Sequence, residues 1–182
     1  MPVIYGKLQA RSVDMKTGSR FSRGPDVQSS ALTVLHIDDD PNDTQLLRAA
    51  ARKACVPFYL QNVSDGDEAV SYLLGKKMYA DRQRFRFPDL VLLDLRMPRA
   101  TGFELLKWIR GDPRFHELPV IVLSGSELSD DILRAYAFGA NSYFVKPLGF
   151  NALVDLVRKI NTTWLPTRPL NDLPVSRPIS DL

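Results

Sequence analysis

The chain is poor in the features that would tie it to an oxidising compartment or to a membrane. It has one cysteine, Cys55, among 182 residues, so no internal disulfide can form. Cys55 follows an alanine-rich stretch typical of a helix, and we expect it to be a small buried residue. No run of about 18 apolar residues predicts a transmembrane helix, and the polar N-terminus lacks the apolar core of a secretory signal. We therefore expect a cytoplasmic protein without a membrane partner.

An excess of charge is confined to one end of the chain. The formal net charge is +3. Residues 1–30 hold five Lys or Arg against two Asp, which accounts for all of it. Apolar residues are sparse there, so residues 1–30 are expected to form a disordered basic arm. The remainder is balanced and shows no basic cluster typical of a nucleic-acid binder, so no nucleic-acid partner is expected.

Five short apolar runs alternate with five amphipathic stretches between Ala31 and Leu165. The run 90–93 is apolar throughout, as expected of a strand buried on both faces. The alternation predicts one α/β domain, residues 31–165, with a five-stranded parallel sheet, doubly wound, and helices on both faces. The Pro-rich segment 166–182 is expected to be an irregular tail. Strands are expected at 32–37, 58–63, 90–94, 118–123 and 142–145, and helices at about 44–54, 67–74, 101–110, 129–138 and 150–163.

The stretch from Gly75 to Phe87 fits neither pattern. It interleaves five Lys or Arg with Tyr79, Phe85 and Phe87. Such interleaving is found in nucleic-acid-binding segments, but the stretch is short and Asp81 interrupts it. We interpret it as a docking loop or as the extension of a helix, because long loops inside compact domains are usually functional or mobile.

Ionisable or hydroxyl side chains stand at the ends of four of the expected strands. Asp38 and Asp39 follow the first strand, Asp94 the third, Ser124 the fourth and Lys146 the fifth. The carboxyl ends of parallel strands share one edge, where α/β proteins bind ligands. Carboxylates about 4 Å apart repel by about 4 kcal/mol at an effective dielectric near 20, so a cation is required, and oxygen ligands suit Mg²⁺. With Lys146 and Ser124 beside it, Asp94 would be equipped for phosphoryl transfer.

Four motifs lie at the ends of the expected strands: Ile37-Asp38-Asp39-Asp40, Leu93-Asp94-Leu95-Arg96-Met97-Pro98 with Gly102, Val122-Leu123-Ser124, and Tyr143-Phe144-Val145-Lys146-Pro147. Together they resemble the receiver domain of two-component response regulators. The resemblance covers about residues 32–163. It implies the flavodoxin-like strand order 2-1-3-4-5 and a stand-alone receiver, and the segment 75–87 is similar to receivers that pair with phytochrome-type histidine kinases.

This resemblance implies a role for each site residue. Asp94 would accept a phosphoryl group from a phosphohistidine on a sensor histidine kinase. Mg²⁺ would be bound by Asp39, Asp94 and the main-chain carbonyl of Arg96, with Asp38 acting through a bound water. Lys146 would pair with the phosphoryl group. The protein would catalyse only its own phosphorylation and dephosphorylation and would not be an enzyme in the usual sense.

Two further residues would form the switch in such a domain, namely the hydroxyl of Ser124 and the aromatic ring of Tyr143. Arg96 departs from the family pattern, which commonly has a small or polar residue two positions after the acceptor, and we expect it to alter the lifetime of the phosphoryl group. The remaining polar residues near the motifs are interpreted as turn, cap or structural residues: Asp40, Asp43, His36 and His116.

The expected output is a change of surface, because no DNA-binding or enzymatic segment follows Leu165. The resemblance points to the face made by the fourth helix, the fifth strand and the fifth helix, and to a homodimer through it. Residues expected on this face are Tyr136, Phe144, Phe150 and Leu153.

Two rival classes fit part of the pattern. A phosphatase of the haloacid dehalogenase type could use Asp38-Asp39-Asp40, but Asn42 stands where that family has Thr or Val, and no cap insertion is present. Turnover of a phosphate ester would identify it. A degenerate receiver that only binds a partner is the other class, and it would not need the full acidic set and Lys146.

Overall fold

The computed structural model describes residues 32–97 and 101–165. Within them the chain forms a five-stranded parallel sheet in the order β2-β1-β3-β4-β5. This confirms the doubly wound arrangement expected from the sequence. The tails expected at 1–30 and 166–182 lie outside the described residues. The strands are β1 (Leu32–Ile37), β2 (Phe58–Val63), β3 (Leu90–Leu93), β4 (Val120–Ser124) and β5 (Ser142–Val145).

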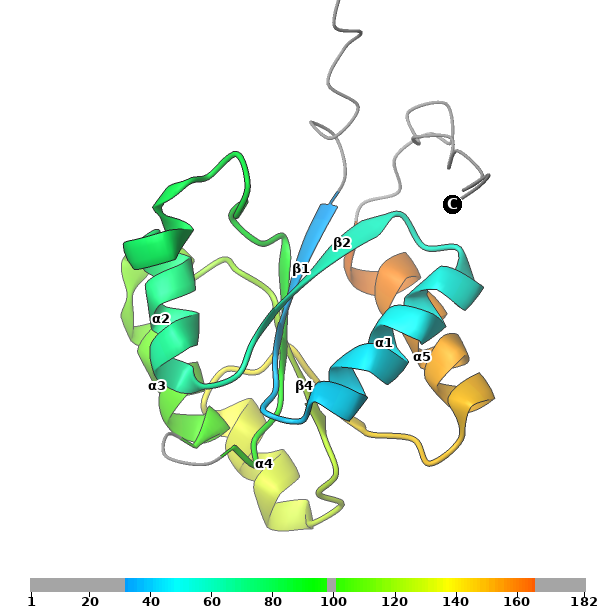
Figure 1. Cartoon of the computed structure of the whole chain (residues 1–182). Helices are drawn as coiled ribbons and strands as arrows, with labels where there is room; N and C mark the ends of the chain where they lie inside the picture. Colours follow the sequence, from blue (N-terminus) through cyan, green and yellow to red (C-terminus); the bar gives the residue numbers. More distant parts are fainter. Residues whose placement is uncertain (1–31, 98–100, 166–182) are drawn as a thin grey trace, which may run out of the picture.

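Helices cover both faces of this sheet, as Figure 1 shows. α1 and α5 lie together on one face, and α2, α3 and α4 lie on the other. Among the described residues, no helix is both long and apolar enough to cross a membrane. The helices are α1 (Pro41–Ala54), α2 (Gly66–Leu74), α3 (Gly102–Gly111), α4 (Ser129–Ala137) and α5 (Phe150–Trp164), with short 3-10 helices η2 (Lys77–Ala80) and η3 (Pro113–Phe115).

The central strands are buried because their apolar side chains alternate between two cores. In β3, Val91 and Leu93 pack under α2 and α3, whereas Leu90 and Leu92 pack under α1 and α5. All four are at most 1% exposed. Successive side chains of a strand point to opposite faces, so an unbroken apolar run serves two helical layers at once.

The segment 75–87 is anchored to the folded domain by two buried rings, although most of its residues are exposed. Tyr79 and Phe85 are buried in the core under α2, where they form an aromatic cluster with Tyr72 at centroid distances of 4.9–6.3 Å. The guanidinium of Arg82 donates hydrogen bonds to the carbonyls of Leu73 and Phe85. The aromatic spacing therefore reflects core packing, and these two rings are not available to stack on nucleic-acid bases.

The structure confirms the interpretation of Asp40 as a cap residue, but it places the start of α1 three residues before the expected position 44 and changes the expected role of Cys55. Asp40 is the N-cap, with its carboxylate accepting from the amide of Asn42 at 2.8 Å, and Pro41 begins the helix. A proline suits this position because its missing N–H would have no partner there. At the other end, α1 stops at Ala54, and Cys55 caps it in a left-handed conformation with its side chain exposed. Cys55 is therefore not a core residue.

Candidate functional site

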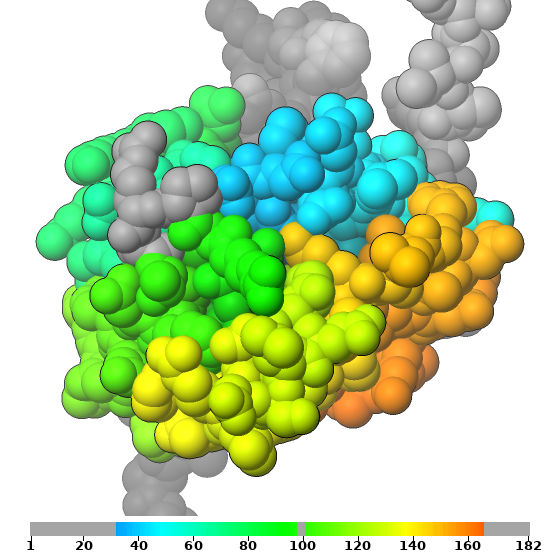
Figure 2. All heavy atoms as spheres, turned by 90° about the horizontal axis from the view of Figure 1, so that it is seen from below, coloured from blue at the N-terminus to red at the C-terminus, as the bar shows by residue number. Residues whose placement is uncertain are grey.

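The ends of β1, β3, β4 and β5 meet at one edge of the sheet. Figure 2 looks onto this edge, and the blue, green, yellow-green and orange segments that follow these strands come together there. The meeting follows from the strand order, since β1, β3, β4 and β5 are consecutive neighbours and all run in the same direction. The predicted gathering of strand-end residues is therefore present in the fold.

Three carboxylates form the acidic part of the site. Asp38, Asp39 and Asp94 each offer an oxygen, and these atoms lie within 4.8 Å of one another. Asp38 and Asp94 are 1% and 6% exposed, whereas Asp39 is open to solvent. Carboxylate oxygens at this spacing, with one side open, suit a hard divalent cation that keeps several waters. The donor set thus fits the metal that the sequence predicts.

Lys146 supplies the positive charge inside this cluster. Its Nζ lies 2.8 Å from Asp38 Oδ2, 2.9 Å from Asp94 Oδ2 and 2.7 Å from Asp43 Oδ2. Burial lowers the pKa of Lys146, but the hydrogen bonds that its ammonium group donates to these carboxylates outweigh burial and raise the pKa above its ordinary value. Asp43 was expected to be a turn or cap residue, and the structure corrects this: it is a third carboxylate partner of the ammonium group.

Asp38 is held ionised by donors on both of its oxygens. Burial raises its pKa, but hydrogen bonds from His36, Lys146 and the backbone amide of Asp40 outweigh burial and set the pKa at about 2. The Asp40 amide donates to Oδ1 at 2.9 Å. His36 Nε2 lies 3.3 Å from Oδ2. The carboxylate is therefore charged at neutral pH and fixed in direction.

Asp94 is held between a hydroxyl and an ammonium group. Ser124 Oγ donates to Asp94 Oδ1 at 2.9 Å, and the backbone amide of Arg96 donates to the same oxygen at 3.2 Å. Lys146 occupies the other oxygen, Oδ2. Four of the five residues that the sequence placed at strand ends are thus joined by direct hydrogen bonds through Asp94 or Lys146, and Asp39 stands beside them.

Tyr143 and Arg96 both reach the segment between β4 and α4. The Tyr143 hydroxyl donates to the carbonyl of Ser126 at 2.8 Å, and burial raises the pKa of this tyrosine. Arg96 Nη2 lies 3.2 Å from Ser126 Oγ and 3.9 Å from Asp131 Oδ2, and its side chain remains 61% exposed. Arg96 therefore lies alongside the site mouth, where it links the loop after β3 to the start of α4. Its carbonyl as a metal ligand stays a prediction.

Several residues that support the site from neighbouring elements were not predicted from the sequence. Asp43 and Asp131 belong to the first turns of α1 and α4, and each helix begins at the carboxyl edge of the sheet. Their position in the sequence could have indicated this role, because the first turn of a helix that follows a strand lies near the end of that strand. His36 and Ser126 carried no comparable signal, because their roles depend on contacts with other elements.

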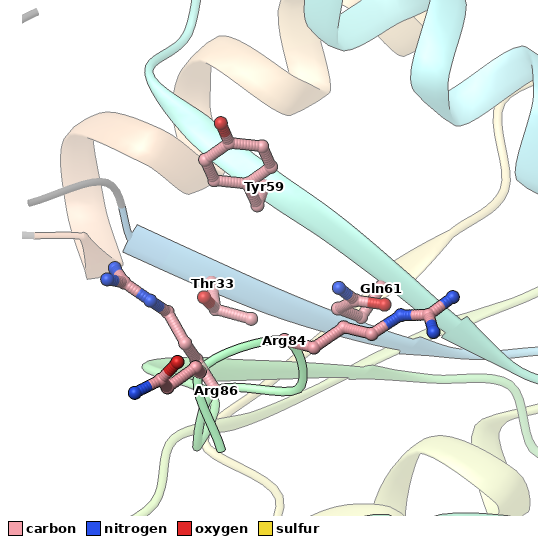
Figure 3. A pocket seen from close by; sticks show the side chains of 6 residues that line it. Thr33, Tyr59, Gln61, Arg84 and Arg86 are labelled. Carbon is pink, nitrogen blue, oxygen red and sulfur yellow. The ribbon is translucent and has the colours of Figure 1, made fainter. Parts of the chain in front are cut away.

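A separate hollow of about 230 Å³ lies at the opposite end of the sheet. Figure 3 shows Thr33 on β1 and Tyr59 on β2, with Arg84 and Arg86, from the segment before β3, extending in opposite directions near Thr33. Gln61 and Gln83 complete its lining. None of the predicted site residues borders this hollow.

Comparison with known proteins agrees with this site. The model of the response regulator receiver domain matches residues 34–158. The probable methanogenesis regulatory protein FilR2 of Methanothrix harundinacea is 34% identical over 132 residues, which cover 72% of this chain and 83% of that protein. The response regulator Rcp1 of Synechocystis is 30% identical over 134 residues, which cover 74% of this chain and 89% of that protein.

Solved structures show the same fold. The response regulator RPA3017, in red light signaling of R. palustris, superposes with a TM-score of 0.71 at 35% identity, covering 80% of this chain and 99% of that one. The phosphorylated cyanobacterial phytochrome response regulator RcpA gives 0.69 at 34% identity, covering 80% and 100%. The Mn²⁺-bound form of Rcp1 gives 0.66 at 28% identity, covering 79% and 99%. Because the family model spans most of the chain and the strand order and acidic edge agree with it, this chain belongs to the family of response regulator receiver domains.

Proposed function

We propose that Asp94 accepts a phosphoryl group from a phosphohistidine of a sensor histidine kinase. One observation carries the proposal: the Asp94 carboxylate is held between the Ser124 hydroxyl and the Lys146 ammonium group, beside two more carboxylates. An Asp94 oxygen forms the new bond to phosphorus while the phosphorus–nitrogen bond breaks, and the kinase imidazole keeps the electron pair of that bond. In-line transfer of this kind depends on positioning and on charge neutralisation more than on covalent chemistry.

Asp39 and Asp94 are proposed to bind Mg²⁺, with the Arg96 carbonyl as a third ligand and Asp38 acting through a water. The mutual spacing of the three carboxylates supports this assignment, and Rcp1 has been solved in a Mn²⁺-bound form. The cation supplies a counter-charge for the phosphoryl oxygens. The chain's own contribution is to keep Asp38 and Asp94 ionised and fixed in place.

Ser124, Lys146 and Tyr143 are proposed to read the phosphorylation state. Lys146 and Ser124 already hold one oxygen each of Asp94, so both are in position to hydrogen-bond a phosphoryl group on that residue. A shift of Ser124 at the end of β4 moves Ser126 two residues later, and Ser126 carries the Tyr143 contact. The switch would therefore pass from the acceptor to the face that includes β5.

The proposed output is a change of interaction surface, with no reaction on an outside substrate. Exposed apolar side chains on α4 and at the start of α5 suit a homodimer through α4, β5 and α5 in the phosphorylated state. Leu133, Tyr136 and Phe150 are 67%, 48% and 39% exposed there. Analytical sedimentation with and without beryllofluoride, a phosphoryl mimic, tests this proposal. A monomer in both states would contradict the proposed dimer.

The kinase is proposed to be of the phytochrome type and the protein to act in the cytoplasm. Two similar proteins are described as response regulators in red light signaling or of phytochrome, which supports the kinase class. Phosphotransfer from such a kinase at a rate no greater than from an unrelated sensor kinase would count against this class. It would leave the acceptor role of Asp94 intact.

Incubation with acetyl phosphate and Mg²⁺ tests the acceptor role directly. We expect the wild-type chain to gain one phosphoryl group by intact mass and Asp94→Asn to gain none. Asp40→Asn is the matched control, because Asp40 is an exposed helix cap whose function Asn preserves. Steady turnover of a phosphate ester would instead support the phosphatase alternative, and no labelling at all would support a degenerate receiver.

A further inference from the structure

His36 is a buried polar side chain among apolar neighbours of β1. It is 1% exposed, whereas Leu35 and Ile37 on either side belong to the apolar core. Burying an imidazole costs free energy unless its nitrogens have hydrogen-bond partners. An apolar residue would fill this place in the strand without that cost, so the partners of the ring indicate what His36 does.

The first partner is Asp38. Residues two apart along a strand point to the same face, and the backbone amide of Asp38 still bonds to the Val63 carbonyl at 3.1 Å, which continues the pairing of β1 with β2. This places His36 Nε2 3.3 Å from Asp38 Oδ2. Because Asp38 is ionised and accepts only, Nε2 must carry the hydrogen.

The second nitrogen is anchored by two other elements. Asn62 is the register partner of His36 on β2, and its Oδ1 lies 3.1 Å from His36 Nδ1. Thr44 on α1 places Oγ1 3.3 Å from Nδ1 and 2.8 Å from Asn62 Oδ1. The Thr44 hydroxyl donates to Asn62 Oδ1, and both oxygens lie within hydrogen-bond distance of Nδ1, so the ring is held on this side by β2 and α1.

These contacts leave Asp38 with little freedom. Its Oδ2 is shared by Lys146 and His36, and its Oδ1 accepts from the Asp40 amide. A carboxylate has about four acceptor positions, so about one remains, on Oδ1. A carboxylate with one position left is suited to hold a water and not to coordinate an ion through both oxygens.

We propose that His36 is a positioning residue for the divalent cation site, acting through Asp38. Its Nε2–H holds Oδ2 and thereby aims the last acceptor position of Asp38, while Asn62 and Thr44 fix the ring from behind. The inference rests on the proposed cation site of the receiver. It adds to that site three residues outside the acidic cluster: His36 on β1, which contacts Asp38, and Asn62 on β2 and Thr44 on α1, which hold the His36 ring.

Two amide substitutions separate this role from simple core packing. In His36→Gln the amide nitrogen stands near the place of Nε2, so the Asp38 contact is kept. In His36→Asn it stands near Nδ1, so the contact with Asn62 and Thr44 is kept and the Asp38 contact is lost. Binding of Mn²⁺ alone, measured by titration calorimetry, should weaken about tenfold in His36→Asn, since loss of an outer-shell partner typically costs 10–100-fold in metal affinity. It should stay within about threefold in His36→Gln.

A mutant cycle with Asp38→Asn tests whether the effect passes through Asp38. If it does, His36→Asn changes Mn²⁺ affinity little when Asp38→Asn is already present. Urea unfolding in EDTA shows that each variant is folded. If His36→Asn does not fold, Thr44→Val loosens the ring from α1 and is expected to weaken Mn²⁺ binding by about threefold.

The outcomes are distinct. Weaker binding in His36→Asn alone supports the proposal. Equal affinity in the wild type and His36→Asn, or equal weakening in both amide variants, overturns it and leaves the cation site standing. Failure of the wild type to bind Mn²⁺ contradicts the proposed cation site itself, and the role of His36 falls with it.

Discussion

Replacing Gly102 with alanine should disturb the site through the backbone of Asp94. Gly102 is the first residue of α3, and a Cβ there would lie 2.3 Å from the Asp94 carbonyl oxygen and 2.7 Å from Leu95 Cα. Both neighbours are backbone atoms, so no side-chain rotation relieves the contact. The helix start and the Asp94 peptide must separate by at least about 0.7 Å, since contacts under 3.0 Å are not sustained.

The expected free-energy change combines two opposed effects. Overpacking in a tightly packed region costs about 1–3 kcal/mol, and Ala gains up to about 1 kcal/mol over Gly inside a helix. We expect Gly102→Ala to lower the free energy of unfolding by about 1–2 kcal/mol. Labelling by acetyl phosphate should slow by on the order of tenfold to a hundredfold, because displacing a reacting group by about 1 Å has effects of that size.

Gly111 provides the matched control within the same helix. A Cβ at Gly111 meets no atom within 4 Å, so Gly111→Ala should raise the free energy of unfolding by about 0.5–1 kcal/mol. Its labelling rate should be that of the wild type. Urea denaturation of the wild type and the two variants measures the difference. Equal stability of the two alanine variants would show that the Gly102 contact with the Asp94 backbone does not limit stability.

Three further predictions concern Arg96, Tyr72 and Lys146. Arg96→Asn removes the link to Ser126 and should shorten the phosphoryl lifetime by on the order of threefold to tenfold, or about 0.7–1.4 kcal/mol in barrier; an unchanged half-life in a dephosphorylation assay would contradict this. Burial raises the pKa of Tyr72 from 10.0 to about 12. The folded chain thus keeps a proton that the unfolded chain loses, so about 2–3 kcal/mol of stability, present below pH 10, should be lost as the pH rises toward 12. Urea unfolding at pH 9 and 11.5 should show a smaller loss in Tyr72→Phe; an equal loss would assign the effect to other groups. Lys146→Met leaves three carboxylates without their cation and should cost about 3 kcal/mol in EDTA, and Mg²⁺ should restore part of it by binding the folded state. No effect of Mg²⁺ on the variant would count against the cation site.

The elements of the fold were predictable because each carries its own local pattern. β1, β2 and β5 begin and end where the apolar runs do. β4 begins at Val120 and not at Leu118, because Pro119 has no N–H to give to a ladder. The sheet order came from the resemblance to receivers, since periodicity alone does not say which strands are neighbours.

The strand-end residues were predictable for a similar reason, since parallel strands bring their carboxyl ends to one edge. What the sequence did not show are contacts between side chains of distant elements. Lys146 meets Asp43 across 103 positions, and His36 meets Asn62 across 26. The burial of Tyr79 and Phe85 was hidden in the same way, because a basic segment around them suggested an exposed surface. Such contacts depend on strand order and helix placement, which must be known before the side chains can be paired.

The role of Asp94 as phosphoryl acceptor can be tested by locating the phosphoryl group on the chain. Borohydride reduction of the phosphorylated chain converts an aspartyl phosphate to homoserine, which peptide mapping locates by mass. We expect homoserine at position 94 alone, and none after labelling of Asp94→Asn. Homoserine at position 38 or 39, or an acid-stable phosphoryl group on Ser124, would contradict the assignment of Asp94 as the acceptor.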